Sequence, residues 1–441
     1  MSKMGIYFSD RKNINRKSFG KIFNYLDENE VPYSSDDDSV CFKFGFGCYK
    51  ELKSCSMFMG MYSKYNVMSD DEILHISYFG INLIDVYLYE ALSFFLTVDN
   101  FRATLRNKTS REDIFNAMIS VDRDTLIMCV CISIFWAEYW ILRWREISKY
   151  KYVGVFSGAQ IYNMMLIEIS KRSQFSPLLM ESFFTGNEFY LEKKYEPIPN
   201  NSNVKFANVY RSLNFNYNRL NIENAYQKII KKKNKNKTEC QSKNISIDKK
   251  NASRVITIVA QVVNDFSIIC TFKNYLNTIE FYKNAIDLLL MNDDNYLIIK
   301  THPWEKFKNK TNITYNEIKS YIFTKPADQI SRFKLIESWD IDELCEKSDF
   351  IMTLCSQAGI ECAMRGKKII QFGNAFYGGK GFSHDYSTLD DFMNDFNSGL
   401  IYPSLSSDEM KNFNEFLSKM FSSFLVSNSD SVNSILDRYF Q

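Results

Sequence analysis

The sequence predicts an α/β protein with two Rossmann-like domains, and three observations support this fold class. A chain of 441 residues is long for one hydrophobic core and suits two domains. Residues 151–180 read as strand, turn, helix and strand, which is a βαβ unit, and residues 255–372 alternate apolar strands with helices. Hydrophobic residues make up 45% of the chain, which supplies two buried cores and excludes global disorder.

The first half begins with an aromatic-rich stretch that we interpret as irregular over residues 1–70, with strand-like pieces near 39–46. Residues 72–99 and 111–149 have helical character, although the β-branched residues of 81–86 are also compatible with a strand. The clearest unit follows. An apolar strand at 152–156, the Ser157-Gly158 turn, a helix over 159–172 and a strand at 177–180 that ends at Glu181 together predict a parallel sheet.

Residues 125–142 are apolar and about as long as a membrane span. Glu138 lies inside this segment, and Trp136, Trp140 and Trp144 recur on one helical face. A charged side chain near the bilayer centre costs several kcal/mol. A buried or interfacial helix of a soluble domain is therefore favoured over a span.

The second half starts after a Lys- and Asn-rich segment, residues 226–254, which we interpret as a linker or loop. It acts either as a solvated tether or as a basic patch for anionic lipid, worth about 1 kcal/mol per cation near the surface. Strands are expected at 255–263, 296–300, 350–353 and 368–372, with helices between them. The predicted organisation is an N-terminal domain (1–225), the linker, a C-terminal domain (255–405) and terminal helices (406–441) that pack back across the domain junction.

Charge and cysteine usage exclude several classes of function. The net charge of +2 predicts no nucleic-acid partner. The ten cysteines are scattered without a CxxC pair, and three histidines do not supply a zinc site. The first residues lack the apolar region of a signal peptide. Together these features indicate a reducing, cytoplasmic environment.

Polar residues follow three of the predicted parallel strands, where such sheets bind ligands. Gln261 and Asp265 follow the first strand, and Lys300-Thr301-His302-Pro303 end the second. Ser356-Gln357-Ala358-Gly359 follow the third strand and open a helix, which would offer free backbone N–H groups and a hydroxyl to a phosphate. His302 could donate to a phosphate or stabilise a departing nucleotide, and Glu361 could accept from a ribose.

Each of these residues has a structural alternative. Ser356 could be no more than the N-cap of its helix, and Glu361 no more than a favourable acid in the first turn. A lone His-Pro pair is more often structural. Their occurrence together at successive strand ends favours a binding site. The Gly-rich loop 374–382 adds Tyr377 and Lys380, and Lys380 could meet a phosphate or carboxylate, although such a loop alone could be only a loop.

These residues resemble the bacterial capsule polysaccharide biosynthesis proteins of the Kdo-transferase type. The resemblance is clearest from residue 256 to 385, in VAQVVNDFSII, in YLIIKTHPWEK and in SDFIMTLCSQAGIECAMRGKKIIQFGNAFYGGKGFSHDY. Cys362 stands where the family pattern has Ala. In the first half, VGVFSGAQIYN and LLMESFFTGNEFYLEKKYEPIPNNS are similar to family segments, but residues 1–70 and the basic segment are not.

The resemblance implies a single-module GT-B glycosyltransferase, in which two Rossmann-like domains face a cleft. Residues 1–225 would be its acceptor-side domain, and residues 255–405 its nucleotide-sugar-binding domain. It implies transfer of 3-deoxy-octulosonic acid (Kdo) or a related nonulosonate from a CMP donor, with retention, to a lipid or glycolipid acceptor at the inner membrane surface. By resemblance, His302, Ser356 and Glu361 belong to the CMP-sugar pocket, and Glu181 is a candidate general acid/base whose structural alternative is a cap or surface residue.

No metal or other cofactor is expected in that scheme, in which His302 and the helix start at Ser356 take the place of a cation. The lack of an Asp-x-Asp pair beside a predicted strand end in the second half is consistent with this expectation. The expected location is cytoplasmic and peripheral to the inner face of the membrane, with other capsule-assembly proteins as candidate partners. Two alternatives stay open. One is the same fold with another donor, CMP-sialic acid or a UDP-sugar, and the other is a non-catalytic nucleotide-sugar-binding subunit of capsule assembly.

Overall fold

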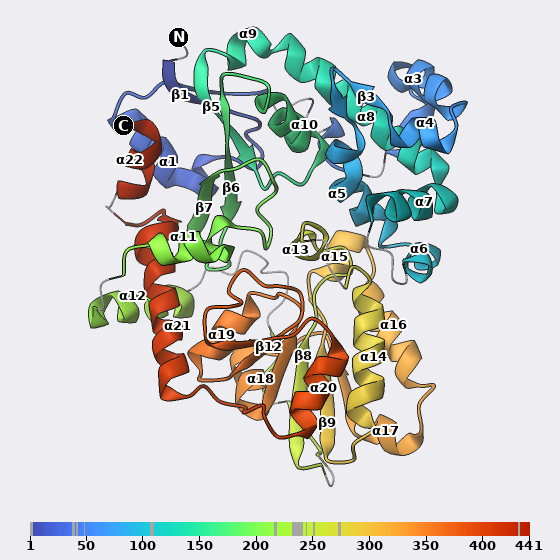
Figure 1. The fold of residues 1–441 in the computed structure, drawn as a ribbon, viewed down its shortest axis with the longest axis vertical. Coiled ribbons are helices and arrows are strands. Elements are labelled where there is room, and N and C mark those ends of the chain that lie inside the picture. Colours follow the sequence, from blue (N-terminus) through green and yellow to red (C-terminus); the bar gives the residue numbers. More distant parts are fainter. Residues whose placement is uncertain are drawn as a thin grey trace. The chain divides into compact units, whose positions relative to one another are not determined.

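The chain folds into two compact units in the computed structural model (Figure 1). Unit 1 comprises Met1–Ser202 and Phe424–Gln441, and unit 2 comprises Asn203–Ser423. The structure describes residues 3–37, 40, 43–47, 49–105, 110–215, 218–231, 241–243, 245–249, 252–271, 275–430 and 433–441.

Unit 1 contains a six-stranded sheet in the order β14-β7-β6-β5-β1-β2. The strands β2, β1, β5 and β6 are parallel, β7 is antiparallel to β6, and β14 is antiparallel to β7. The five strands from β2 to β7 thus have the order 2-1-3-4-5 of doubly wound folds. The strands of this sheet are β1 Lys3–Phe8, β2 Tyr33–Ser35, β5 Tyr150–Phe156, β6 Ser176–Ser182, β7 Glu188–Lys193 and β14 Val426–Ser427.

The expectation that residues 1–70 are irregular is wrong, because β1 lies inside the sheet between β5 and β2. Ile6 and Phe8 of β1 are buried in one core cluster with Phe19 and Ile22 of α1 (Arg16–Glu28). The strand expected near 39–46 is absent from its described residues, 40 and 43–46; residues 39, 41 and 42 lie outside the described part.

Helices account for most of the rest of unit 1, as expected for residues 72–99 and 111–149. The β-branched stretch at 81–86 contributes only the two-residue strand β4 (Ile81–Asn82), paired with β3 (Ser77–Tyr78), before α5 begins. The helices are η1 Lys50–Ser54, α3 Ser56–Asn66, α4 Asp70–Leu74, α5 Ile84–Phe95, α6 Asp99–Thr104, α7 Arg111–Val121, α8 Arg123–Leu142, α9 Trp144–Ile147, α10 Ile161–Ser170 and α22 Ser434–Phe440.

The helix α8 corresponds to the apolar segment of span-like length. By length and composition it could cross a membrane, but 78% of its most apolar window is buried inside unit 1. It packs against α10, α3, α5 and α7. The indoles of Trp136 and Trp140 donate to the carbonyls of Phe44 and Tyr162, at 3.2 and 2.8 Å. These contacts are those of a core helix.

Unit 2 contains a six-stranded, fully parallel sheet in the order β10-β9-β8-β11-β12-β13. In chain order this is 3-2-1-4-5-6, the Rossmann arrangement, and its topological switch point lies between β8 and β11. The predicted class of two Rossmann-like α/β domains is confirmed. The strands are β8 Arg254–Val259, β9 Asn295–Lys300, β10 Phe333–Ile336, β11 Phe350–Thr353, β12 Ile369–Gln371 and β13 Ser383–Asp385.

The boundaries of the units differ from the expected ones at 225 and 405. Helices α11 and α12 belong to unit 2, where the Tyr226 hydroxyl donates to Asn414 Oδ1 of α21 at 2.9 Å. Described parts of the expected linker also pack on unit 2, since Ile245 and Ile247 contact the cluster around Trp339. The helices of unit 2 are η2 Asn203–Lys205, α11 Ala207–Ser212, α12 Arg219–Ile230, α13 Phe266–Ile269, α14 Thr278–Leu290, α15 Glu305–Asn309, α16 Ile313–Ile322, α17 Ala327–Ser331, α18 Ile341–Lys347, α19 Ala358–Met364, α20 Leu389–Asn397, α21 Ser407–Lys419 and, reaching the unit boundary, the π-helix η3 Met420–Phe424.

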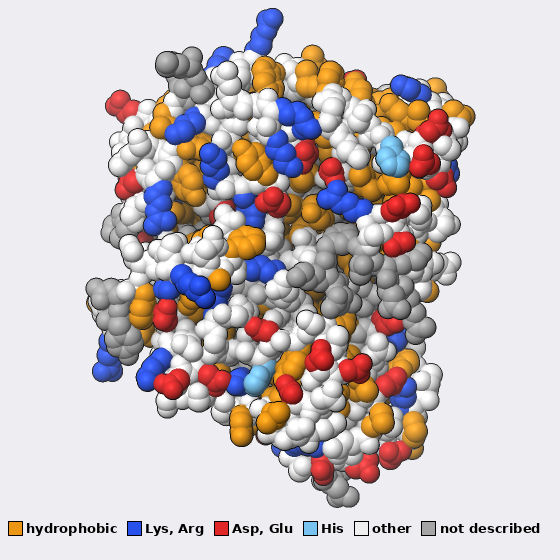
Figure 2. All heavy atoms as spheres, viewed as in Figure 1, with side chains coloured by type: hydrophobic (Ala, Val, Ile, Leu, Met, Phe, Trp, Pro, Cys, Tyr) orange, Lys and Arg blue, Asp and Glu red, His pale blue; other side chains and the backbone are white. Residues whose placement is uncertain are grey.

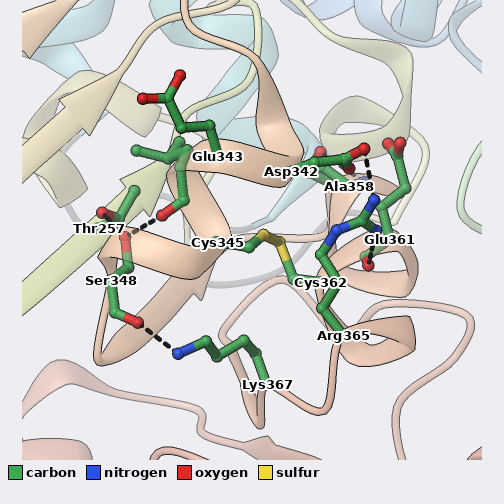
Figure 3. Close-up of a disulfide and its surroundings, with 12 residues drawn as sticks. Thr257, Asp342, Glu343, Cys345, Ser348, Ala358, Glu361, Cys362, Arg365 and Lys367 are labelled. Carbon is green, nitrogen blue, oxygen red and sulfur yellow. Dashed lines mark hydrogen bonds and ion pairs between the residues drawn. A yellow bond between two sulfur atoms is a disulfide. The ribbon is translucent and has the colours of Figure 1, made fainter. Parts of the chain in front are cut away.

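Two cysteines that the sequence showed no reason to pair form a disulfide between α18 and α19 (Figure 3). Cys345 and Cys362 are both buried, and their Cα atoms are 5.8 Å apart. Arg365, the C-cap residue of α19, also forms an ion pair with Asp342 of α18 and donates to the carbonyl of Glu361. The disulfide and the ion pair therefore fix α19 to α18.

Candidate functional site

The predicted polar residues of unit 2 gather at the switch point of its sheet. Gln261 follows β8, His302 follows β9 and Ser356 follows β11, and these three strands are adjacent in the order β9-β8-β11. Parallel strands end at the same edge, so the three segments emerge side by side. This is the edge at which open α/β sheets bind ligands.

The side chain of Gln261 bridges the switch point. Its carbonyl Oε1 accepts from the backbone N–H of Cys355 at 2.8 Å and from the Cys355 thiol at 3.3 Å. Its Nε2 donates to Asp265 Oδ2 at 3.4 Å. Gln261 is buried, so the residue predicted to contact the donor holds together the two loops that would surround it.

Asp265 is the N-cap of α13, where its Oδ1 accepts from the Ser267 N–H at 2.8 Å. The negative charge of this carboxylate also acts on His302, where it favours the protonated imidazole and so raises the pKa of the ring. The structure therefore joins Gln261, Asp265 and His302 in one group, as the sequence predicted.

His302 has a defined tautomer. The backbone N–H of Trp304 donates to Nδ1 at 3.1 Å, so in the neutral ring the proton is on Nε2. The pKa of the imidazole is lowered to about 4, mainly by burial; the charge of Asp265 opposes this shift, and the charges of Lys300 and Lys308 contribute to it. At neutral pH the ring is therefore a neutral N–H donor.

Glu305, which the sequence analysis missed, fixes the turn that carries His302. Its Oε1 accepts from the backbone N–H of Val263 at 3.0 Å, and its Oε2 accepts from that of Thr314 at 3.1 Å. Burial raises the pKa of this carboxyl, and the hydrogen bonds oppose that rise. The acid two residues after the His-Pro pair was the available signal.

The Ser356 turn is held mainly by contacts within the fold. The Ser356 hydroxyl accepts from the Ala358 N–H at 3.3 Å, although the N-cap position of α19 is Gln357 and not Ser356. Its carbonyl accepts from the hydroxyl of the buried Tyr377 at 2.9 Å. A Cβ on Gly359 would lie 2.6 Å from that hydroxyl oxygen, so the glycine is required for the packing of Tyr377.

The first turn of α19 presents two further predicted residues. Gln357 Oε1 is buried and has no hydrogen-bond partner among the described residues. Glu361 lies four residues later on the same helix, partly exposed. A buried amide oxygen without a donor is costly, and a bound ligand could supply that donor.

Lys380 of the loop 374–382 points to a different neighbour. Its Nζ donates to the carbonyl of Lys205 at 3.2 Å and lies 4.5 Å from the centroid of the Tyr210 ring. Burial lowers the pKa of Lys380 to about 8, and nearby Lys419 and Arg211 act in the same direction against Asp385. Lys205 and Arg211 were not predicted, because residues 1–225 were assigned to the other domain.

Glu181 lies in unit 1, in the strand β6, opposite Tyr190 of β7. It is partly exposed. Burial raises the pKa of the Tyr190 hydroxyl, and the charges of Glu192 and Glu181 add to that rise. The sequence analysis did not predict β1, and it also missed two buried acids that follow neighbouring strands. Asp10 follows β1 and accepts from the Tyr162 hydroxyl at 2.9 Å, and Asp36 follows β2 and accepts from Arg143 Nε at 2.7 Å.

Within the described part of the chain, no group of three or more His, Cys, Asp or Glu side chains lies close enough to hold a metal ion.

Comparison with known proteins gives one family and several similar folds. The sequence model for capsule polysaccharide biosynthesis proteins matches residues 185–426. The solved structure of Thermosulfurimonas dismutans KpsC, beta Kdo 2,4 transferase, is 15% identical, with a TM-score of 0.42 over 66% of this chain and 88% of that chain. The beta Kdo 2,7 transferase of the same organism's KpsC is 16% identical, with a TM-score of 0.37 over 69% and 96%. No curated protein matches the sequence.

Proposed function

We propose that this chain, which belongs to the capsule polysaccharide biosynthesis protein family, is a glycosyltransferase of capsule or surface polysaccharide synthesis. The proposed donor is a CMP-activated Kdo or related nonulosonate, and the proposed acceptor is a lipid or glycolipid at the inner face of the cytoplasmic membrane. Family membership and the Rossmann-type sheet of unit 2 support the nucleotide-sugar donor. Retention of configuration and independence of metal ions belong to the same proposal.

The observation that carries the proposal is the state of His302 at the switch point. Its neutral ring keeps Nδ1 occupied by the Trp304 N–H, which leaves the Nε2–H to bind an external acceptor. A phosphate oxygen of the donor is such an acceptor. When the sugar–phosphate bond breaks, negative charge grows on the departing nucleotide, and a fixed N–H donor stabilises that charge more than it stabilises the bound donor.

The proposed role of the surrounding residues is to position this donor. Gln261 and Glu305 fix the loops on either side of His302, and Gln357 Oε1 offers an acceptor for a hydroxyl or amino group of the nucleotide. Glu181 of unit 1 is the proposed general acid/base for the acceptor, and its partly exposed position at the end of β6 supports that role.

The test is His302→Ala in a transfer assay with purified protein, CMP-Kdo and a lipid acceptor. Loss of one preorganised donor predicts a fall in turnover of about 10²–10³. His384→Ala is the matched control. It also removes an imidazole, but His384 lies on β13, at the edge of the sheet and away from the switch point. Unchanged turnover in His302→Ala, with thermal unfolding like that of the control, would show that the site is assigned wrongly.

Two further experiments separate the class of donor from catalysis: ligand-induced stabilisation of the wild type, and binding and transfer by a Glu181 variant. CMP at 100 times its Kd is expected to stabilise the wild type by about 2.7 kcal/mol, whereas UDP and GDP are expected to have little effect. Glu181→Gln is expected to keep CMP binding and lose transfer. Stabilisation by UDP instead of CMP would indicate another donor, and CMP binding without any transfer would indicate a non-catalytic subunit.

A further inference from the structure

Lys380 is a buried cation of unit 2 with little to balance its charge. Its side chain is 8% exposed, and its ammonium contacts the Lys205 carbonyl and the face of the Tyr210 ring. Among the described residues, no carboxylate lies within ion-pair distance of it. A buried charge is normally paired, because its desolvation is otherwise uncompensated.

Around Lys380, the positive charges of Lys419 and Arg211 are opposed by one carboxylate, that of Asp385, which accepts a hydrogen bond from the Gly379 N–H. Arg211 of α11 acts on Lys380 as a like charge, and among the described residues it too has no ion-pair partner. Lys419 lies on the same Tyr210 ring, 4.4 Å from its centroid, but its ammonium is paired with Glu415 Oε1 at 2.7 Å. Figure 2 shows Lys and Arg side chains gathered on the face of the molecule where α11 lies.

This group adjoins the Ser356 turn of the candidate site. Tyr377, three residues before Lys380 in the same loop, donates its hydroxyl to the Ser356 carbonyl at 2.9 Å. The charge of Lys205 acts on the thiol of Cys355, where it opposes the rise in pKa that burial causes. Lys205 therefore lies near the end of β11, and the 374–382 loop connects it to the switch point.

We propose that Lys205, Arg211 and Lys380 form an oxyanion subsite beside the Ser356 turn, and that it holds a carboxylate or phosphate of the sugar donor. The proposal rests on the proposed function for the identity of that ligand. Lys380 has three N–H donors and uses one on the Lys205 carbonyl. Arg211 supplies a planar set of donors that suits a carboxylate or phosphate. A donor that is itself a sugar acid carries both groups, so the subsite would select acidic sugars over neutral ones.

Lys380→Met tests the subsite, with Lys419→Met as the matched control. Both variants remove an ammonium from the same ring, but Lys419 already has a carboxylate partner and lies outside the subsite. Affinities for inorganic phosphate, CMP and CMP-Kdo are measured by calorimetry on wild type and both variants. We expect Lys380→Met to weaken CMP-Kdo at least tenfold and Lys419→Met to leave it within twofold of wild type. Arg211→Gln, at an exposed position, provides a second subsite variant if Lys380→Met does not fold.

The three ligands distinguish the source of the oxyanion. Loss of CMP-Kdo affinity with CMP affinity retained identifies the sugar carboxylate, and equal loss of both identifies the donor phosphate. If Lys380→Met binds all three ligands as tightly as wild type does, the subsite is overturned, and the role of Lys380 is limited to its contact with the Tyr210 ring. If wild type binds neither CMP nor CMP-Kdo, the proposed donor is wrong. The subsite is then supported only if inorganic phosphate binds wild type and not Lys380→Met, and it is overturned otherwise.

Discussion

At the scale of the residue, the lowered pKa of His302 predicts a specific dependence of stability on pH. The folded ring has a pKa of about 4, below the ordinary value near 6.5. As the pH falls from about 6.5 to about 4, the unfolded chain binds a proton that the folded chain does not, so the free energy of unfolding decreases. Above pH 6.5 both states are neutral at this residue, and its contribution is constant.

His302→Gln removes the titrating group, so the variant should lose less stability than wild type between about pH 7 and about pH 5. Denaturant unfolding of both proteins at the two pH values measures the difference. The comparison of changes with pH cancels the cost of the substitution itself. An identical loss in both proteins would mean that the ring is protonated in the folded protein at pH 5 and is not a neutral donor.

The sequence could predict the residues that follow strands but not the partners that the fold brings to them. His302, Gln261 and Asp265 lie together because the parallel strands before them end at the same edge of the sheet. The apolar pattern of the sequence was enough to predict those strands. The Lys205 carbonyl accepts from Lys380, which lies 175 positions later in the chain, and no local pattern encodes that contact. Gly359 was predicted as part of the turn that opens a phosphate-binding helix, and the structure shows that its missing Cβ makes room for Tyr377.

At the scale of the element, prediction succeeded where strands are long and apolar and failed at β1. The strands β8 (RVITIV) and β9 (NYLIIK) are mostly apolar and rich in β-branched residues, whereas β1 (KMGIYF) contains one β-branched residue and a glycine. Gly5 is required there, because a Cβ at this position would lie 2.4 Å from the Pro32 carbonyl oxygen. Tertiary packing therefore places in the sheet a segment whose local propensity is weak, and Asp10 at its end was missed as a result.

The disulfide between α18 and α19 predicts a stability that depends on reductant. Closing a loop of 17 residues stabilises a folded domain by about 3 kcal/mol through the restricted unfolded chain. Reduction with dithiothreitol should lower the free energy of unfolding of unit 2 by about that amount. The Cys345→Ala/Cys362→Ala variant should not respond to dithiothreitol, and peptide mapping of unreduced protein should recover the two cysteines on linked peptides. Separate peptides would contradict the bridge.

At the scale of the whole molecule, the chain passes between its two units twice, after Ser202 and after Ser423. The segment 424–441 returns to unit 1, where β14 adds to β7 and the Tyr439 hydroxyl donates to the Leu191 carbonyl at 3.1 Å. The sequence predicted terminal helices over 406–441 but could not assign α21 and α22 to different units. Both helices are amphipathic, and an apolar face does not specify which core covers it.

The returning segment makes the stability of unit 1 depend on the last residues of the chain. Phe440 of α22 is 5% exposed, and its ring lies 6.0 Å from that of Tyr25 and 5.7 Å from that of Tyr152. Phe440→Ala should therefore destabilise unit 1 by about 3–5 kcal/mol, the usual cost of deleting a buried phenyl ring. Hydrogen exchange should accelerate in β6 and β7 and stay unchanged in β9 and β11. Phe323→Ala, at a side chain that is 67% exposed in unit 2, is the control and should change neither. Equal acceleration in both sheets of Phe440→Ala would show that the two units unfold as one, and retained CMP binding in this variant would show that unit 2 holds its ligand independently of unit 1.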